Sequence, residues 1–262
     1  MLIAVDIGNS NIGFGLFPDP LSGESLYVGK VITHPARTSG FYKKIVAQLI
    51  KDSLDGNMPR SISAVVASVV PARNTMMNKA LAAFCKKRPL YVSAGINSGL
   101  TLGVREPFKL GADRIANAVA GISCNKGRPT AVVDFGTATT ITVVGKKSTL
   151  LGGAILPGIS VMLEALNSGT AKLPLVSTDA LEKALGQDTA SSIISGIIYG
   201  TAGAVEKLII MMEKELKFKL QLVLTGGNAP FVSSFIDRSF IHRPNMTFEG
   251  LRLIYLMNTG NR

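Results

Sequence analysis

Two aspartates of this chain occur in nearly the same local sequence, about half a chain length apart. Asp6 lies in the segment LIAVDIGNSN at residues 2–11, and Asp134 lies in AVVDFGTATT at residues 131–140. In each copy an apolar run ends in the Asp, and one apolar residue and a Gly precede small polar side chains. A carboxylate at a strand end can hold Mg²⁺ directly or through water, and a Gly-rich turn exposes backbone N–H groups to phosphate oxygens. The chemistry indicated is binding of a phosphorylated ligand together with a cation.

An ordinary hairpin turn would explain either copy alone, but turns need no such matching, so the second copy favours a functional pair. Two further glycine-rich turns follow apolar runs, GGAILPG at residues 152–158 and GGN at residues 226–228. The first of these, as a turn between a strand and a helix, has a structural explanation as well. Together the four turns favour a nucleotide-binding cleft.

The remaining candidates for acid–base chemistry are carboxylates. The chain has no Walker A sequence, and His34 and His242 both stand in settings typical of surface or structural histidines. Asp113 stands out in KLGADR at residues 109–114, where a helix is expected to begin. It either caps that helix or acts chemically, with Arg114 beside it favouring the ionised carboxylate and able to clamp an anionic substrate.

Composition narrows the class of protein. The formal net charge of the 262 residues is +11, but the basic residues are scattered and Trp is absent, so an anionic small substrate is favoured over nucleic acid. We expect no signal peptide and no membrane span, because no basic leader precedes the first strand and no apolar run approaches about 18–20 residues. Cys85 and Cys124 lack metal-binding spacing, which predicts reduced thiols in a cytoplasmic protein.

The elements that must hold these residues follow the same order in both halves of the chain. After the first hairpin we expect strands at residues 28–33, 63–70 and 90–93, and helices at 40–54 and 73–87. Around the second hairpin we expect strands at 149–154 and 220–225, and helices at 113–123, 160–168, 190–218 and 248–258, the last capped by Thr247. The predicted domains are residues 1–112 and 113–262, facing each other across a cleft.

The chain resembles the type III pantothenate kinases, of the actin/hexokinase/heat-shock ATPase superfamily, over nearly its whole length. The motifs that carry this resemblance keep their order along the chain: DIGNSNI (6–12), SVVP (68–71), GADR (111–114), DFGTATT (134–140), GGAILPG (152–158), GQDT (186–189), SGIIYG (195–200), TGG (225–227) and TFEGLRLIY (247–255). The fold implied is α/β, with two similar ribonuclease H-like (actin-like ATPase) domains. Each would be a mixed β-sheet flanked by helices, with a cleft between them.

The resemblance also implies roles for single residues. The phosphates of ATP would contact the first hairpin, with Asp6 also near Mg²⁺: Asp6, Ile7, Gly8, Asn9, Ser10, Asn11, Ile12 and Gly13. Thr137 would contact ATP, and Asp134 would bind a monovalent cation, K⁺ or ammonium. Pantothenate would contact Val104, Gly111, Ala112, Asp113, Arg114 and Thr189, with Asp113 as the proton acceptor. Members of the family are cytoplasmic homodimers with the pantothenate pocket close to the dimer interface.

Two positions depart from the family pattern. Ser10 stands where Thr is usual, which keeps the hydroxyl, and Val104 stands near where many members place a Tyr that contacts pantothenate. The reaction implied is ATP-dependent phosphorylation of pantothenate to 4′-phosphopantothenate, the first step of coenzyme A biosynthesis. Two alternatives stay open, namely another small-molecule kinase or phosphohydrolase of the superfamily, and a transcription accessory protein that binds nucleic acid. The presence of Asp6, Asp113 and Asp134 together favours an enzyme.

Overall fold

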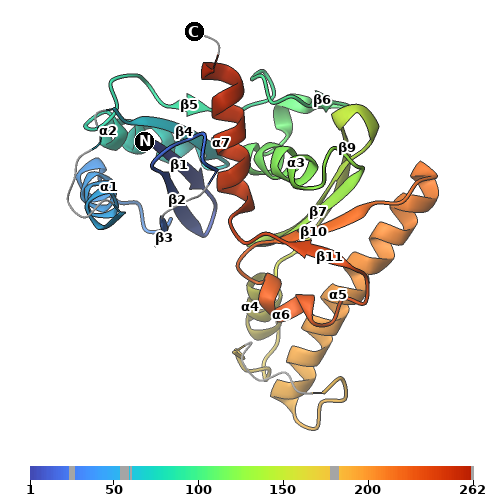
Figure 1. Ribbon diagram of the computed structural model, residues 1–262. Helices are drawn as coiled ribbons and strands as arrows, with labels where there is room; N and C mark the ends of the chain where they lie inside the picture. Colours follow the sequence, from blue (N-terminus) through green and yellow to red (C-terminus); the bar gives the residue numbers. More distant parts are fainter. Residues whose placement is uncertain (24–26, 54–58, 60, 178–182, 261–262) are drawn as a thin grey trace. The chain divides into compact units, whose positions relative to one another are not determined.

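The chain folds into two compact units (Figure 1). Unit 1 comprises Met1–Ser123 and Asn245–Arg262, and unit 2 comprises Cys124–Pro244. The computed structural model describes residues 1–23, 27–53, 59, 61–177 and 183–260. The helices that contain Asp113 and Phe248 both pack in unit 1. The sequence-based division into domains 1–112 and 113–262, and the cleft between them, stay predictions.

Unit 1 is built on a mixed β-sheet with the strand order β3-β2-β1-β4-β5. Its strands are β1 (Leu2–Ile7), β2 (Asn11–Phe17), β3 (Tyr27–Ile32), β4 (Ser63–Ser68) and β5 (Leu90–Tyr91). The β1–β2 and β2–β3 pairs are antiparallel, whereas β4 runs parallel to both β1 and β5. The ends of β1 and β4 therefore meet at one edge of the sheet, which is the edge that carries the first predicted hairpin.

The two faces of this sheet are covered by different helices, and strand alternation assigns each side chain to a face. Ile3, Val5 and Ile7 pack with α1 (Ser39–Ser53) and α2 (Pro71–Leu81). Leu2 and Ala4 pack with α3 (Ala112–Cys124) and α7 (Met246–Thr259). Asp6 is in phase with Leu2 and Ala4. Its side chain therefore belongs to the face that α3 and α7 cover.

On that face the helices approach the sheet and each other unusually closely. A Cβ at Gly13 or Gly15 would lie 2.8 Å from the Phe248 ring, so these glycines of β2 make room for an aromatic side chain of α7. A Cβ at Gly250 of α7 would overlap the Ala116 carbonyl of α3. The backbones of α3 and α7 are therefore in contact, and the contact depends on glycine.

Unit 2 repeats the topology of unit 1. Its strands β7 (Thr130–Phe135), β8 (Ala138–Val144), β9 (Thr149–Pro157), β10 (Gln221–Thr225) and β11 (Phe240–His242) follow the order β9-β8-β7-β10-β11. Pairing is again antiparallel from β7 to β9 and parallel from β7 to β11. One face of this sheet packs with α4 (Ile159–Gly169), α5 (Thr189–Leu216) and α6 (Ala229–Ser233). The duplicated order of elements predicted from the sequence is confirmed.

The short elements complete the assignment. They are β6 (Thr101–Leu102), the 3₁₀ turns η1 (Pro107–Lys109) and η2 (Lys146–Ser148), and the one-and-a-half-turn helix α6 already named. Three of the short elements, β6, α6 and β11, are too short to show a periodic pattern in the sequence and are not among the predicted elements. The predicted helix end at residue 54 lies outside the described residues.

The boundaries predicted for α2, α7 and β9 are wrong. Helix α2 begins at Pro71, a residue suited to the first helical position, and ends at Leu81 instead of spanning residues 73–87. Helix α7 begins at Met246 after Asn245, so Thr247 is no cap, and its hydroxyl donates instead to Asn117 Oδ1 at 2.9 Å. The glycines at residues 152–153 lie inside β9, and the turn from that strand to a helix is at Gly158.

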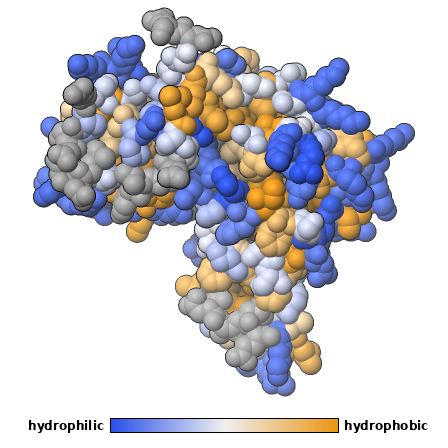
Figure 2. Space-filling model, in the orientation of Figure 1, coloured by the Kyte–Doolittle hydropathy of each residue, from blue (hydrophilic) through white to orange (hydrophobic). Residues whose placement is uncertain are grey.

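Helix α5 corrects the expectation that no segment has the length and hydropathy of a membrane span. Among the described residues, this one helix is long and apolar enough to cross a membrane, since an 18-residue stretch of it has a mean hydropathy of 1.5. Half of that stretch is buried inside the protein, and the core of unit 2 includes Ile194, Ile198, Val205 and Ile209. The helix is a core helix. Figure 2 shows hydrophilic residues spread over both units on the face drawn.

We predict that Gly250→Ala destabilises the protein by about 3 kcal/mol, the upper end of the usual cost of overpacking, because the methyl group meets rigid backbone. Urea denaturation at pH 7.5 measures the change. Gly203→Ala in α5 is the matched control, since a Cβ there meets no atom within 4 Å and Ala favours the helix by up to about 1 kcal/mol. Equal effects of the two substitutions would show that α3 and α7 do not depend on this contact.

Candidate active site

The turn between β1 and β2 is held in shape from outside the hairpin. Within the turn, the Gly8 N–H donates to the Asn11 carbonyl at 2.9 Å. Thr33, which directly follows β3, donates from its N–H to the Ser10 carbonyl at 2.9 Å and from Oγ1 to the Gly8 carbonyl at 2.8 Å. Thr33 is completely buried, whereas Asn9, Ser10 and Asn11 are exposed. The polar tip of the turn is therefore fixed and open to a ligand.

Packing within unit 1 accounts for three of the predicted phosphate-binding residues. The side chains of Ile7 and Ile12 are fully buried in the core beneath α1 and α2. Gly13 lies under the ring of Phe248, so packing alone explains the glycine. These residues can meet phosphate only through their backbones, and the available side chains are those of Asp6, Asn9, Ser10 and Asn11.

Asp113 lies at the same edge of unit 1 as this turn. It stands in the first turn of α3, the helix that covers the face to which Asp6 belongs. A Cβ at Gly111 would overlap the Asp113 carboxylate and would lie 3.6 Å from Val69 Cγ1. Val69 in turn donates from its N–H to the Ile7 carbonyl at 3.0 Å. Through Val69, the structure joins the GADR turn to the hairpin turn.

The surroundings of Asp113 favour its protonated form more than water does. Burial raises the pKa of this carboxyl, while the Arg114 N–H, which donates to Oδ1 at 2.8 Å, and the Arg114 charge act in the opposite direction. Burial also lowers the pKa of the Arg114 guanidinium, against the attraction of Asp113. A carboxylate with a raised pKa is a stronger base, which is what proton abstraction requires.

The hairpin of unit 2 resembles that of unit 1 but is one residue shorter. Ile7 pairs with Ile12 and leaves four residues in the first turn, whereas Phe135 pairs with Thr139 and leaves three in the second. Asp134 stands in β7 between Thr140 of β8 and Thr225 of β10. The two turns therefore present their polar groups differently, which argues against equal roles.

The glycine-rich turns of unit 2 converge on this hairpin. Asn228 donates from its N–H to the Phe135 carbonyl at 3.0 Å, and Gly158 donates to the Thr137 carbonyl at 3.1 Å. Gly226 has a φ of +94°, and a Cβ there would lie 2.5 Å from Asp134 Oδ1. Within unit 2 the glycine-rich turns therefore lie close together, and the nucleotide-binding cleft stays a prediction. Nothing in the sequence pattern assigns this contact to Gly158 or Asn228, and Thr33 carries no recognisable sequence signal.

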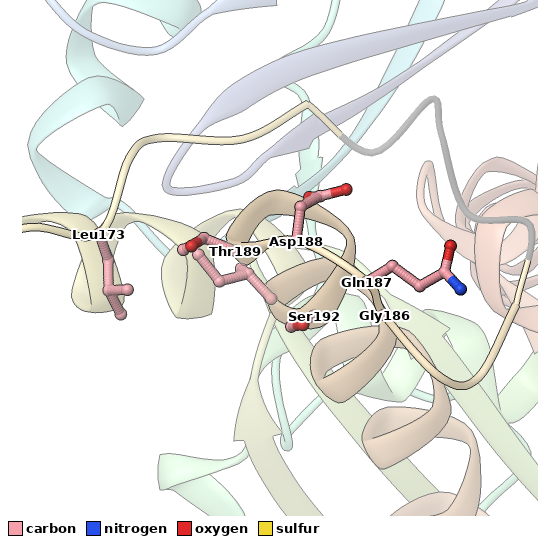
Figure 3. Close-up of a pocket in the computed structure, with 7 residues that line it drawn as sticks. Leu173, Gly186, Gln187, Asp188, Thr189 and Ser192 are labelled. Atoms are coloured by element: carbon pink, nitrogen blue, oxygen red, sulfur yellow. The ribbon is translucent and has the colours of Figure 1, made fainter.

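Thr189 lines a pocket of about 500 Å³ at the beginning of α5 (Figure 3). The pocket residues come from the loop before this helix and from its first turns: Leu173, Gly186, Gln187, Asp188, Thr189, Ser192 and Ile193. Asp188 caps the helix by accepting the Ser191 N–H at 2.8 Å in a capping box, which fixes the loop against the helix. Val104, in contrast, lies half-buried in the bend between β6 and η1 in unit 1.

Metal binding at these sites has to rely on few protein ligands. In the described ranges of the chain, no three His, Cys, Asp or Glu side chains lie close enough to hold a metal ion. Mg²⁺ is commonly bound through one or two carboxylates, with waters and substrate phosphates as the other ligands. A single carboxylate such as Asp6, next to a turn suited to phosphate, fits that pattern.

Comparison with known proteins identifies the family. The family model described as type III pantothenate kinase matches residues 2–210. The chain belongs to the type III pantothenate kinase family. Curated type III pantothenate kinases from Myxococcus xanthus and Dehalococcoides mccartyi are 37% and 35% identical to it over 261 and 258 residues. These matches cover 98% of this chain in both cases, and 99% and 98% of the two relatives.

Solved structures match the fold at lower identity. A crystal structure described as a Baf family transcriptional activator from Campylobacter jejuni has a TM-score of 0.60 at 21% identity, covering 98% of this chain and 99% of the other. One described as a 2-dehydro-3-deoxygalactonokinase from Sinorhizobium meliloti has a TM-score of 0.59 at 12% identity, covering 100% and 98%. The two helix-flanked mixed sheets are those of the actin-like ATPases. As a type III pantothenate kinase, the enzyme uses ATP and acts in coenzyme A biosynthesis.

We predict that Asp113→Asn stabilises the protein at pH 7.5 but not near pH 4. Because burial raises the folded-state pKa of Asp113, the stability of the wild type falls as pH rises from the unfolded-state pKa, about 3.9, through the folded value. The Asn amide carries no charge and so does not have this cost of burial. The stability gain of Asp113→Asn over the wild type therefore grows over the same pH interval. Thermal unfolding at a series of pH values measures it.

Asp188→Asn is the matched control, since hydrogen bonds from the backbone and side chain of Ser191 lower the pKa of that carboxyl. We therefore expect Asp188→Asn to give no increase in stability at neutral pH. A loss of stability in Asp113→Asn at pH 7.5 would contradict the assigned cost of burial.

Proposed function

We propose that this enzyme transfers the γ-phosphoryl group of ATP to the primary hydroxyl of pantothenate, giving 4′-phosphopantothenate, with Asp113 as the general base. The observation that carries the proposal is the placement of Asp113. A Cβ on Gly111 in its turn would lie 3.6 Å from Val69 Cγ1, and the Val69 N–H donates to the Ile7 carbonyl at the end of β1. Asp6 belongs to the face of the same sheet that α3 covers. A base and a phosphate-binding turn are thus held at one edge by hydrogen bonds and packing.

Asp113 would accept the proton of the attacking hydroxyl. Its raised pKa brings its basicity closer to that required, and the Arg114 N–H fixes the direction of the carboxylate. Such phosphoryl transfer needs little covalent chemistry from the protein, so catalysis consists mainly of positioning and charge neutralisation. The half-buried setting strengthens each electrostatic interaction by reducing contact with water.

The first hairpin would hold the ATP phosphates. The exposed polar tip formed by Asn9, Ser10 and Asn11 offers backbone and side-chain donors, and the Thr33 clamp keeps them in place. Asp6 would hold Mg²⁺ directly or through water, with phosphate oxygens completing the coordination. The ion supplies positive charge that offsets the negative charge of the phosphates.

The second hairpin would hold the monovalent cation, K⁺ or ammonium, at Asp134. Its ligands there would be oxygen atoms of the carboxylate and of nearby backbone carbonyls, the type of ligand that replaces the hydration shell of K⁺ in proteins. Thr137, in the tip of this hairpin, would contact ATP. Asn228 and Gly158 support the tip by bonding its carbonyl groups.

The substrate contacts are also part of the proposal. The Arg114 guanidinium is the candidate partner of the pantothenate carboxylate, because planar guanidinium groups bind carboxylates through paired hydrogen bonds. Gly111 and Ala112 lie in the same turn, Thr189 lines the pocket at the beginning of α5, and Val104 would supply an apolar contact. The homodimer and the cytoplasmic location implied by the family remain predictions.

We predict that Asp113→Asn lowers turnover by about 10²-fold or more, the usual contribution of a general base, while nucleotide binding is kept. Pantothenate-dependent ADP release measures turnover, and calorimetry with ADP measures binding. Asp237→Asn, which changes an exposed Asp of unit 2, is the matched control. Near-normal turnover in Asp113→Asn would rule out its role as base. ADP release with sugars or acetate but not pantothenate would favour another kinase of the superfamily.

We predict that activity requires K⁺ or ammonium, and that Asp134→Asn loses most of the stimulation by these ions. The amide keeps the shape of the side chain but removes the charge that attracts the cation. ADP release is measured at a series of K⁺ concentrations, with Na⁺ keeping the ionic strength constant. Full activity of the wild type in Na⁺ alone would contradict the assignment of a cation to Asp134.

A further inference from the structure

Arg73 is a cation without an acidic partner at the edge of the sheet that carries the first hairpin. It stands in the first turn of α2, which begins at Pro71 directly after β4. Its Nη2 lies 3.2 Å from His34 Nδ1, and its Nε is buried without a hydrogen-bond partner. In the described part of the chain, no carboxylate forms an ion pair with Arg73.

The contact with His34 places the Arg73 guanidinium beside the hairpin turn. His34 directly follows Thr33, whose N–H and hydroxyl bond the Ser10 and Gly8 carbonyls on one side of the turn. On the other side, the segment that leads into α2 bonds the end of β1 through the Val69 N–H and the Ile7 carbonyl. The Arg73–His34 contact therefore links the segment after β3 to the segment after β4, the two segments that support the turn.

Because the Nε is enclosed by the protein, a ligand can reach the Arg73 guanidinium only through its Nη groups, and the side chain as a whole is half-buried. The planar fork of a guanidinium matches the paired oxygens of a phosphate. Arg37, another cation near this turn in sequence, already lies 5.4 Å from the centre of the Phe41 ring. Arg73 is therefore the cation of this edge that is best suited to an anionic ligand.

We propose that Arg73 binds the polyphosphate of the nucleotide, and that His34 is a positioning residue that holds the guanidinium at the hairpin turn. This inference rests on the proposed role of the hairpin in binding ATP phosphates. It assigns a function to His34, which the sequence pattern alone indicated to be a surface or structural histidine.

The test compares the binding of ADP and of adenosine by calorimetry, with Mg²⁺ and without pantothenate. We expect Arg73→Gln to weaken ADP binding about 10-fold or more, the usual effect of losing a charge-assisted hydrogen bond, and to leave adenosine binding unchanged. Arg88→Gln, which removes the same charge from an exposed position of unit 1, is the matched control and should leave both unchanged. If Arg73→Gln does not fold, Arg73→Lys, which keeps the charge but loses the fork, should weaken ADP binding selectively.

His34 is tested by a pair of substitutions with the same readout. His34→Ala should weaken ADP binding about 3-fold, and His34→Asn should restore it, because the Asn Oδ1 can accept the same hydrogen bond from Arg73. Unchanged ADP binding in Arg73→Gln, or equal losses for ADP and adenosine, would overturn the inference while leaving the hairpin's role intact. A wild-type protein that binds ADP no better than adenosine would overturn both.

Discussion

The backbone contact between α3 and α7 is the constraint on which the edge of unit 1 that carries Asp6 and Asp113 depends. Gly250 allows α7 to touch the Ala116 carbonyl of α3, and Gly13 and Gly15 allow the Phe248 ring to lie on β2. These contacts fix how far α3 lies from the sheet, and hence where its first turn meets the ends of β1 and β4. Asp113 in that turn and Asp6 at the end of β1 then share a face because strand side chains alternate. Packing between the helices and the sheet thus determines how Asp6 and Asp113 are placed.

The duplicated topology places two similar hairpins in different surroundings. In unit 1, the face of the sheet that includes Asp6 is covered by that unit's own α3 and α7. In unit 2, the core beneath α4, α5 and α6 includes Val133 and Phe135, so the alternation of β7 directs Asp134 to the opposite face. The second turn is also shorter and is supported by Gly158 and Asn228, where the first is supported by Thr33. Different supports and lengths are consistent with different ligands for the two aspartates.

The correct sequence predictions rest on local patterns of apolar residues. The boundaries and contacts that were not predicted depend on tertiary packing. The apolar runs before Asp6 and Asp134 are long enough to mark buried strands, and the order of elements then gave the duplicated fold. The end of α2 at Leu81 and the true beginning of α7 depend on packing and capping that no periodicity encodes. The clamp from Thr33 and the contact between Arg73 and His34 join segments 25 and 39 residues apart. A single sequence contains no signal for such pairs, because each residue alone is typical of a surface or a strand end.

Charge balance gives a physical reason for cations at this site. Asp6 and Asp113 bring negative charge to the edge where a polyphosphate would bind, and burial already disfavours the ionised form of Asp113. Arg114 offsets the charge of Asp113, and Arg73 would be a single cation for the nucleotide. The basic residues behind the net charge of +11 are scattered along the chain, so they attract anions without neutralising a bound one. Most of the charge of the phosphates must then be met by bound cations and by the backbone N–H groups of the turns. The proposed base, held close to an anionic co-substrate, would therefore favour bound metal ions, because further arginines beside Asp113 would lower the pKa of the carboxylate that is proposed to accept the proton.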